Sequence, residues 1–217
     1  NGLNSAITKC PSAAEKTRLH FILGQLYQQS NVLDSARSHY SQALKASAPF
    51  EISFNARLNR AISGGGDKLS RDLKKMLKDA KNAGYKDQVY YAMAEVEFNE
   101  NDEQEAIYFL HQSAFYSTTN TRQKGMAYER LADLSFSKRN YVPAQKYYDS
   151  CAQVITDAYP NAETIRNKAN NLAALVRAVE ISQREDSLQR IALMDEKSRE
   201  KFLKDVIKQT KEEEARR

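Results

Sequence analysis

Apolar and small residues recur at helical spacing between residues 17 and 49, in two stretches separated by a short polar segment. Leu23 and Gly24 belong to the first stretch, and Ala36 and Tyr40 belong to the second. Residues three, four and seven positions apart share one face of an α-helix, so each stretch predicts a helix with one apolar face. Glycine and alanine allow two helix backbones to approach closely, while the tyrosine fills the space beside them. The segment therefore predicts a helix–turn–helix unit.

This order of small and large residues is typical of the tetratricopeptide repeat, a unit of two antiparallel helices. A single unit of this size cannot bury its apolar face alone, so further units must follow it in the chain. Three weaker matches occupy approximately residues 50–84, 87–120 and 125–158. The sequence therefore predicts an all-α tetratricopeptide solenoid of about four helix–turn–helix units.

The second unit departs most from the pattern. Its first helix is predicted over residues 50–62, and the segment from Ser63 to Asp67 holds three consecutive glycines, which favour a turn over a continued helix. This glycine run lacks the spacing and the preceding strand of a phosphate-binding loop, so we expect no nucleotide site. Gly84 is expected to end the second helix of the unit. The residues that this helix is expected to bury are Leu69, Leu73, Met76, Leu77 and Ala80.

The third and fourth units repeat the buried positions of the first. Ser12 and Glu15 form a capping box that is expected to start the helix leading into the first unit. Asn31 and Asn101 are expected to cap the second helices of the first and third units. The residues expected to be buried in the third and fourth units are Met93, Ala94, Ala106, Leu110, Leu131, Ala132, Ala144, Tyr148 and Cys151.

One large residue of the first unit, Tyr27, is not repeated. Glu97 and Ser135 take its place in the third and fourth units, and a phenylalanine follows one position later in each, Phe98 and Phe136. If the helices keep standard length, these rings turn toward the inner groove of the solenoid. If the turn is one residue shorter, they belong to the core. We interpret both rings as core, with the groove as the alternative.

The composition agrees with a helical protein, because only 7 glycines and 4 prolines interrupt 217 residues. The net charge of +5 is mild, and residues 67–86 hold seven basic against three acidic residues. A basic stripe at helical spacing is formed there by Arg71, Lys74, Lys78 and Lys81. We interpret this basic stripe as a solvated outer face, with a docking site for an acidic protein surface as the alternative. Because no aromatic residues interleave with it, we expect no nucleic-acid binding.

The segment after the fourth unit predicts more helix. Apolar positions within residues 165–179 predict a capping helix that covers the last repeat. Beyond it the chain is highly charged, with two short apolar stripes separated by a break near Asp195, and residues 208–217 are expected to be a fraying helix or disordered. We therefore divide the chain into a solenoid, residues 1–180, and a charged helical extension, residues 181–217.

The sequence offers no candidate catalytic, metal or cofactor site. His20, His39 and His111 follow no metal-ligand spacing, and each is expected on the surface or in the groove. Cys10 and Cys151 form no CxxC pattern, and Cys151 occupies a small buried position of the repeat. No nucleophile motif is present, and no apolar run approaches the length of a membrane span, so we expect no membrane insertion by this segment. We therefore expect a non-enzymatic protein that binds other proteins.

The inner face of the stacked helices is the expected protein-binding surface. The groove candidates are Phe21, Gln25, Tyr91, Glu95, Phe98, Glu129, Asp133 and Phe136. An alternative function is a chaperone-like peptide-binding module, in which a tetratricopeptide groove holds a C-terminal carboxylate. Glu95 and Asp133 would repel such a carboxylate, so this alternative ranks second.

Three blocks of the sequence resemble one known family. They span Phe21 to Arg60, Leu131 to Ile155 followed by Tyr-Pro-Asn, and Glu185 to Ile207, which reads EDSLQRIALMDEKSREKFLKDVI. These blocks are similar to SprE/PorW-type tetratricopeptide lipoproteins of the gliding-motility and type IX secretion machinery of Bacteroidetes. The last block lies outside the tetratricopeptide pattern, so it carries most of the specificity of the resemblance.

The resemblance implies that the chain is an internal segment of a longer outer-membrane lipoprotein. Such a protein would face the periplasm and be lipid-anchored through a region outside this segment. The resemblance also implies protein partners among the type IX secretion components, such as the periplasmic ring or the outer-membrane translocon. The family supplies no binding residues that can be placed on this chain.

Overall fold

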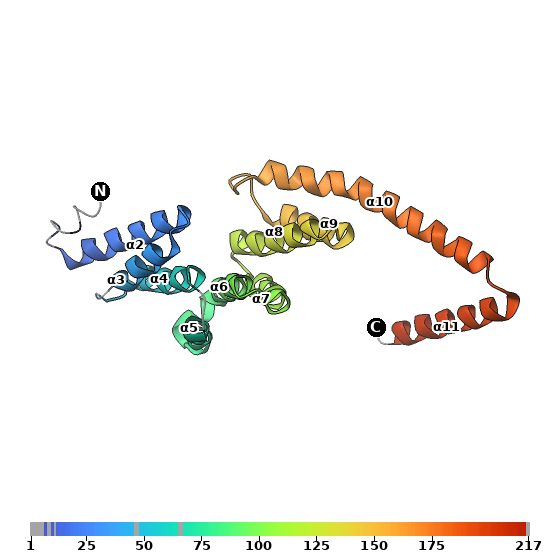
Figure 1. Ribbon diagram of the computed structural model, residues 1–217, viewed down its shortest axis with the longest axis horizontal. Helices are drawn as coiled ribbons and strands as arrows, with labels where there is room; N and C mark the ends of the chain where they lie inside the picture. The colour runs from blue at the N-terminus through green and yellow to red at the C-terminus, as the bar shows by residue number, and fades with distance from the viewer. Residues whose placement is uncertain (1–6, 8–9, 11, 46–47, 65–66, 216–217) are drawn as a thin grey trace. The chain divides into compact units, whose positions relative to one another are not determined.

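A computed structural model of the chain describes residues 7, 10, 12–45, 48–64 and 67–215. In these parts of the chain the regular structure is helical and contains no strand, which confirms the predicted all-α class (Figure 1). The elements are α2 (Ala13–Gln29), α3 (Leu33–Ala43), α4 (Phe50–Ile62), α5 (Asp67–Lys78), the 3-10 helix η1 (Ala80–Tyr85), α6 (Lys86–Asn99), α7 (Glu103–Tyr116), α8 (Thr121–Ser137), α9 (Tyr141–Val154), α10 (Ala162–Ala192) and α11 (Glu196–Ala215).

The chain divides into two compact units, Asn1–Ala169 and Asn170–Arg217. The first unit holds α2 to α9 and the beginning of α10, and the second unit holds the rest of α10 and α11. The sequence-based division at residue 180 separates repeats from tail, which is a different criterion from compactness. That division stays a prediction.

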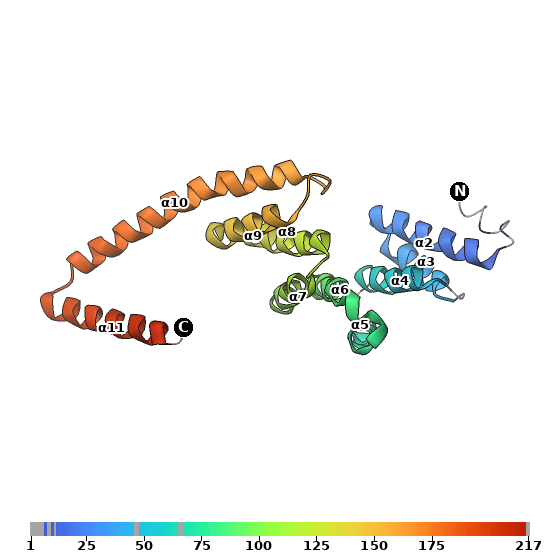
Figure 2. The ribbon, with the colours of Figure 1, turned by 180° about the vertical axis from the view of Figure 1, so that it is seen from behind.

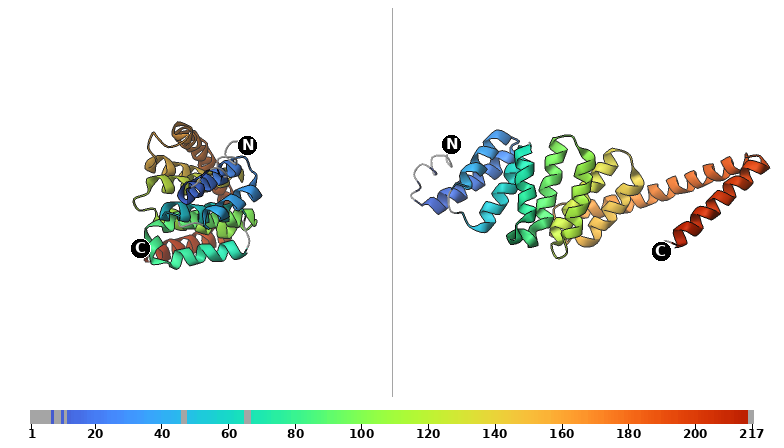
Figure 3. Two further views of the ribbon diagram at one scale, coloured as in Figure 1. Left: turned by 90° about the vertical axis from the view of Figure 1, so that its left-hand side faces the viewer. Right: turned by 90° about the horizontal axis from the view of Figure 1, so that it is seen from below.

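Helices of the first compact unit, Asn1–Ala169, pack in adjacent pairs. The most extensive packing joins α2 to α3, α6 to α7 and α8 to α9, and Figure 2 shows α8 beside α9. Further packing links α3 to α4, α4 to α6 and α7 to α8, so each pair also contacts the next. Figure 3 shows these helices following one another side by side in chain order. The arrangement is compatible with a helical repeat.

Gly24 and Tyr40 make a close approach in the first pair. A Cβ atom at Gly24 would lie 2.6 Å from Tyr40 Cε1, and the Tyr40 side chain is fully buried. The Tyr40 hydroxyl donates a hydrogen bond to Gln28 Oε1 at 2.6 Å. Leu23 and Ala36 are buried as well, so the burial pattern predicted for this pair is confirmed.

The same turn closes all three pairs. Its central residue has a left-handed backbone, with φ of 56° at Asn31, 62° at Asn101 and 60° at Arg139. The N–H of the next residue donates to the carbonyl five residues earlier, which is the hydrogen bond of a Schellman motif. These bonds run from Val32 to Tyr27 at 2.8 Å, from Asp102 to Glu97 at 2.9 Å and from Asn140 to Ser135 at 2.9 Å.

The prediction that Asn31 and Asn101 cap the following helices is wrong. Both hold the left-handed position of the turn, which asparagine adopts more readily than most residues other than glycine. The residue that caps α7 is Asp102, whose side chain accepts a backbone hydrogen bond from its first turn at 3.1 Å. The cap predicted at Ser12 is confirmed, because Ser12 Oγ accepts the Glu15 N–H at 3.4 Å.

Helix α4 begins and ends where the sequence predicts. Its C-cap is Ser63, and α5 begins at Asp67, so the two helices are separated at the predicted glycine turn. Gly65 and Gly66, two of the three glycines of the predicted turn, lie outside the described residues.

Helix α5 is shorter than predicted. It ends at Lys78, and η1 follows, so the prediction that Gly84 ends this helix is wrong. The Asp79 side chain accepts the Lys81 N–H at 3.0 Å and so starts a separate turn, a competition with helix that aspartate often causes. Ala80, predicted to be buried, is consequently exposed.

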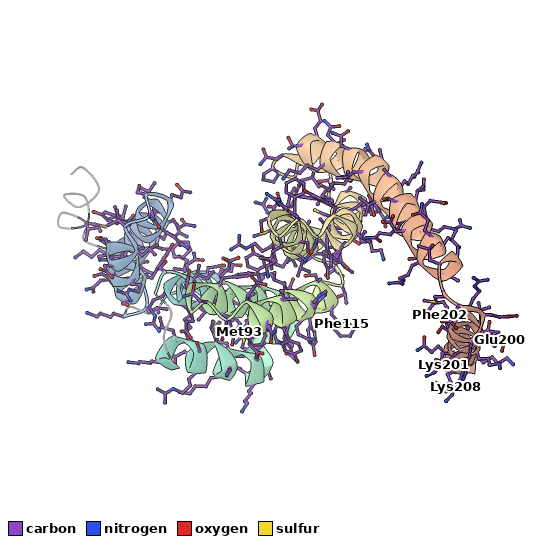
Figure 4. The ribbon with its side chains drawn as sticks, turned by 45° about the vertical axis from the view of Figure 1, so that its right-hand side comes forward. Met93, Phe115, Glu200, Lys201, Phe202 and Lys208 are labelled. Carbon is purple, nitrogen blue, oxygen red and sulfur yellow. The ribbon has the colours of Figure 1, made fainter. Side chains whose placement is uncertain are left out.

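A buried apolar cluster extends from α4 to α8. Met93 is 3% exposed and lies among the side chains of neighbouring helices (Figure 4). All nine residues predicted to be buried in the third and fourth units are buried, so the helical periodicity identified the core correctly. Leu73 and Met76 of α5 are also buried, as predicted.

In the second compact unit, Asn170–Arg217, the break between α10 and α11 falls where the sequence predicts it. Asp195 Oδ1 accepts the Ser198 N–H at 2.9 Å and so caps the start of α11. Arg199 donates three hydrogen bonds to backbone carbonyls at the end of α10 and in the segment that follows it. The acceptors are the carbonyls of Ile191 at 3.2 Å, Ala192 at 2.9 Å and Met194 at 2.9 Å.

Helix α11 is a solvated helix. Among its described side chains none is buried, and Figure 4 shows Glu200, Lys201, Phe202 and Lys208 on it. The helix continues to Ala215, so the described part of the chain end follows the helical alternative. No helix in the described residues has both the length and the apolar content needed to cross a membrane.

Candidate protein-binding surface

A pocket of about 320 Å³ lies in the first compact unit, Asn1–Ala169, where α6 and α8 meet the segment that leads into α10. Three of the predicted groove residues, Tyr91, Glu129 and Asp133, share this pocket. Its full lining is Tyr91, Arg122, Met126, Glu129, Arg130, Asp133, Tyr159, Pro160 and Asn161.

The negative charge of Glu95, beside this pocket, is balanced by an ion pair within the chain. Arg130 Nε lies 3.2 Å from Glu95 Oε1, and the Arg130 guanidinium lies 4.6 Å from the centroid of the Phe98 ring. Burial raises the pKa of Tyr91, and the negative charge of Glu95 raises it further. Carboxylate, cation and ring thus form one closed group on this surface.

Asp133 is neutralised in the same way. The Tyr148 hydroxyl donates to Asp133 Oδ1, and Lys168 Nζ lies 3.2 Å from the same oxygen. Lys168 Nζ also lies 5.0 Å from the centroid of the Tyr148 ring. Burial raises the pKa of Tyr148 to about 12, with the Asp133 hydrogen bond as the next cause. This is a second closed group of carboxylate, cation and ring.

Glu129 has a hydroxyl partner, and within the described residues it forms no ion pair. The Tyr159 hydroxyl donates to Glu129 Oε2 at 2.7 Å. Burial raises the pKa of Tyr159, and the Glu129 hydrogen bond and charge raise it further. Burial, followed by the Glu129 charge, also raises the pKa of the Cys151 thiol to about 12. No cationic side chain in the described part of the chain forms an ion pair with Glu129.

Phe21 and Gln25 do not join this pocket. Both lie on α2, where the half-buried Phe21 ring packs against Tyr40 with 5.8 Å between centroids. Gln25 is exposed. The structure therefore gathers Tyr91, Glu95, Phe98, Glu129 and Asp133 into one region and leaves the first pair of helices apart from it.

The two phenylalanines predicted as core differ in their burial. The Schellman turns have the same length in all three pairs, which is the condition for rings that turn toward the groove. Phe98 is half-buried at the edge of the apolar cluster. Phe136 is 45% exposed and meets Tyr141 edge-on at 5.9 Å, so the core interpretation is wrong for Phe136.

The basic stripe is exposed but does not lie on one helix. Arg71, Lys74 and Lys78 belong to α5, whereas Lys81 belongs to η1, because α5 ends early. All four side chains are exposed, and the charge of Lys74 also acts on the carboxyl of Glu97. Solvated face and docking stripe both remain compatible with this geometry.

A second hollow, of about 370 Å³, lies between α4 and α5. Arg60 and Asp72, which line it, form an ion pair of 3.4 Å across the two helices. None of the predicted site residues lines this hollow. It follows from the sparse packing of α4 on α5.

His20 and His39 form a pair that the sequence analysis did not predict. Their Nδ1 atoms lie 3.0 Å apart, and Tyr27 stacks on the His39 ring with 5.2 Å between centroids. Burial lowers the pKa of both histidines. His111 lies near Tyr147, with 3.2 Å between Nε2 and the hydroxyl oxygen. Within the described chain, no group of three or more His, Cys, Asp or Glu side chains is placed to hold a metal ion.

Sequence reasoning missed Arg122, Arg130, Tyr159 and Lys168. Two of them could have been found from the repeat length, because Glu95 pairs with Arg130 and Asp133 pairs with Lys168, and each partner lies 35 residues later. Tyr159 lies in a connecting segment after the fourth unit, where no periodicity indicates which way a side chain points.

Comparison with models of known protein families finds none that matches this chain. No curated protein matches it either. The case for a function therefore rests on the geometry of the first unit and on the resemblance of the sequence blocks.

Proposed function

We propose that the chain is a tetratricopeptide solenoid that acts as a non-catalytic scaffold for protein–protein interaction. The observation that carries this proposal is the pocket formed by α6, α8 and Tyr159. This pocket gathers residues from successive helix pairs on one surface. Preformed surfaces of packed helices bind partner proteins without a large cost of ordering.

The repeat interpretation is supported by recurring local structure. The same Schellman turn recurs at Asn31, Asn101 and Arg139. Three ion pairs also connect residues 35 positions apart, close to one tetratricopeptide repeat length. These pairs are Glu95 with Arg130, Glu103 with Lys138 and Asp133 with Lys168.

We further propose that the partners are type IX secretion components and that the protein works at the periplasmic face of the outer membrane. This part rests on the resemblance to SprE/PorW-type lipoproteins. The block that carries the resemblance, residues 185–207, contains both Asp195 and Arg199, which fix the corner between α10 and α11. A lipid anchor would lie outside this segment.

A binding assay with purified proteins tests this proposal. The immobilised chain is incubated with the periplasmic ring proteins and with the outer-membrane translocon proteins of a type IX system. Glu129→Arg, in the lining of the pocket, is expected to weaken capture at least severalfold, while Arg18→Glu on the exposed side of α2 is the matched control for a charge reversal. If neither component is captured, the secretion assignment is refuted.

The alternative, a chaperone-like peptide-binding module, gains from one observation. Glu95 and Asp133 are neutralised by Arg130 and Lys168, so they repel a peptide carboxylate less than their charges suggest. Glu129 still presents a negative charge in the pocket. Titration with a peptide ending in Glu-Glu-Val-Asp separates the two functions, because micromolar binding would favour the peptide-binding module.

A further inference from the structure

Three carboxylates lie in or beside the pocket lined by Tyr91 and Tyr159. Two of them share one arrangement, in which the carboxylate pairs with a cation that also contacts an aromatic residue. Glu95 is paired with Arg130, which lies over the ring of Phe98. Asp133 is paired with Lys168, which also donates to the Tyr148 hydroxyl at 3.0 Å and lies 5.0 Å from the centroid of the Tyr148 ring. In both groups a cation is held by a carboxylate and an aromatic ring together.

Glu129 and the neighbouring rings supply the carboxylate and the aromatic part of such a group, and no cation among the described residues completes it. The Glu129 carboxylate is half-buried and accepts a hydrogen bond from Tyr159 at 2.7 Å. The rings of Tyr91 and Tyr159 both line the pocket with it. Burial raises the pKa of Tyr159, and the hydrogen bond to Glu129 and its charge raise it further. No cation of the described chain is paired with this carboxylate.

We infer that this pocket receives an arginine side chain of a protein partner, whose guanidinium pairs with Glu129 beside the rings of Tyr91 and Tyr159. This inference rests on the proposed protein-binding function and specifies what the partner presents.

The size and lining of the pocket support this ligand. A volume of about 320 Å³ is at the lower end of the range for ligand pockets, which suits one long side chain. Met126 and Pro160 supply apolar surface for its methylene groups. Arginine suits the site better than lysine, because a planar guanidinium stacks on aromatic rings and pairs with a carboxylate at the same time.

Two described cations, Arg122 and Arg130, also line the pocket, and neither forms an ion pair with Glu129. Arg130 is engaged by Glu95 and Phe98. Arg122 is exposed, so solvent screens its charge more than that of the half-buried Glu129. Arg122 should nevertheless weaken the binding of a cation, which gives the proposal a second test of opposite sign.

A small-molecule titration followed by NMR tests the pocket in the full chain. The probe is butylguanidinium, and its uncharged analogue of similar shape, N-butylurea, is the control ligand. We expect butylguanidinium at millimolar concentration to shift the amide signals of Tyr91, Glu129 and Tyr159, and we expect N-butylurea to leave them unchanged. Equal binding of both ligands would overturn the proposal.

Three variants separate the charge of Glu129 from its structural role. Glu129→Gln retains an acceptor for the Tyr159 hydroxyl but removes the charge, so butylguanidinium should bind about fivefold more weakly. Arg122→Gln should strengthen binding about twofold. Glu51→Gln, an exposed carboxylate of α4, should have no effect. An unchanged affinity in Glu129→Gln, or weaker binding in Arg122→Gln, would contradict the proposal.

The probe experiment can fail independently of the proposed function. If the secretion components are captured but butylguanidinium does not bind, the partner uses another surface and the arginine pocket is wrong. If butylguanidinium binds through Glu129 but no secretion component is captured, the pocket stands and the partner assignment is wrong.

Discussion

At the scale of single residues, small side chains set how closely the helices approach. Gly24 leaves room for the Tyr40 ring, and Gly125 leaves room for Ile155, whose Cγ2 would lie 2.5 Å from a Cβ atom at that glycine. The Cys151 thiol donates to the Gly125 carbonyl at 3.3 Å, which closes the same contact in the last pair. Substitutions at these glycines therefore act through packing between helices.

Gly24→Ala is expected to destabilise the protein by about 1–3 kcal/mol, because the new methyl group meets a fully buried aromatic ring that cannot move aside. Urea unfolding of the two proteins measures this difference. Gly84→Ala is the matched control, since a Cβ atom there meets nothing within 4 Å. Equal losses in the two variants would show that the effect comes from backbone freedom and not from the Tyr40 contact.

Stability is expected to fall as the pH drops from 7.5 to 5.5. Burial lowers the pKa of His20 and His39 in the folded state below their value in the unfolded chain, so the unfolded state binds protons first as the pH falls through about 6.5. The contribution of the two neutral histidines to the free energy of unfolding is complete above that pH and is lost as the pH falls below it. Urea midpoints across this range measure the slope.

The control for the pH effect is His39→Gln, which removes one member of the pair. The dependence on pH should become flatter in this variant, with a remaining slope from His20 and His111, whose pKa values are also lowered by burial. A slope that is identical in the variant and the original chain would exclude the histidine pair as its cause.

At the scale of elements, polar side chains decide where helices begin and end. Asp79 ends α5 early by accepting a backbone N–H of η1. Asp195 starts α11, and Arg199 of α11 closes the end of α10. A single short segment therefore holds a corner that involves no buried residue of α11. This corner depends on hydrogen bonds rather than on apolar packing.

Arg199→Ala is expected to loosen the corner between α10 and α11 by about 0.5–1 kcal/mol, because three carbonyl hydrogen bonds are lost to water. Hydrogen exchange of the backbone amides of residues 191–199 should become faster. Lys201→Ala, two residues later on the exposed side of α11, should leave these rates unchanged. Similar rates in the two variants would show that the arginine is not what holds the corner.

At the scale of the whole molecule, the two units differ in how they are stabilised. The first unit has a buried apolar cluster from α4 to α8 and ion pairs between residues 35 positions apart. In the second unit α11 is a solvated helix, and Leu193 at the corner before it is 87% exposed. An exposed apolar side chain is also present in the first unit, where Phe115 of α7 is 73% exposed (Figure 4).

Hydrogen exchange is expected to rank the two units clearly. Amides of α6, α7 and α8 should be the best protected, because these helices share the buried cluster and open only when it is lost. Amides of α11 should exchange fastest among the described helices, because its side chains are solvated and an isolated helix of this length is marginally stable. Comparable protection of α6 and α11 would contradict this ranking.

The sequence by itself determined the helices and their buried faces. The small and large residues at helical spacing identified Tyr40, Met93, Leu131 and Tyr148 as core, and all four are buried. This succeeds because the apolar face of a helix is a local property, fixed by 3.6 residues per turn. The breaks near residue 64 and Asp195 were predictable for the same reason, since glycine and capping residues act on their own neighbours.

Only the tertiary structure decided which side chains meet. The tyrosine hydroxyl on Glu129, the cations on Glu95 and Asp133, and the histidine pair all join different helices or a connecting segment. Such contacts depend on how far apart the helices lie and how they are rotated, which spacing within one helix does not specify. The pocket lining, in which Glu129 forms no ion pair with a cation of the described chain, is for this reason a property of the packed molecule.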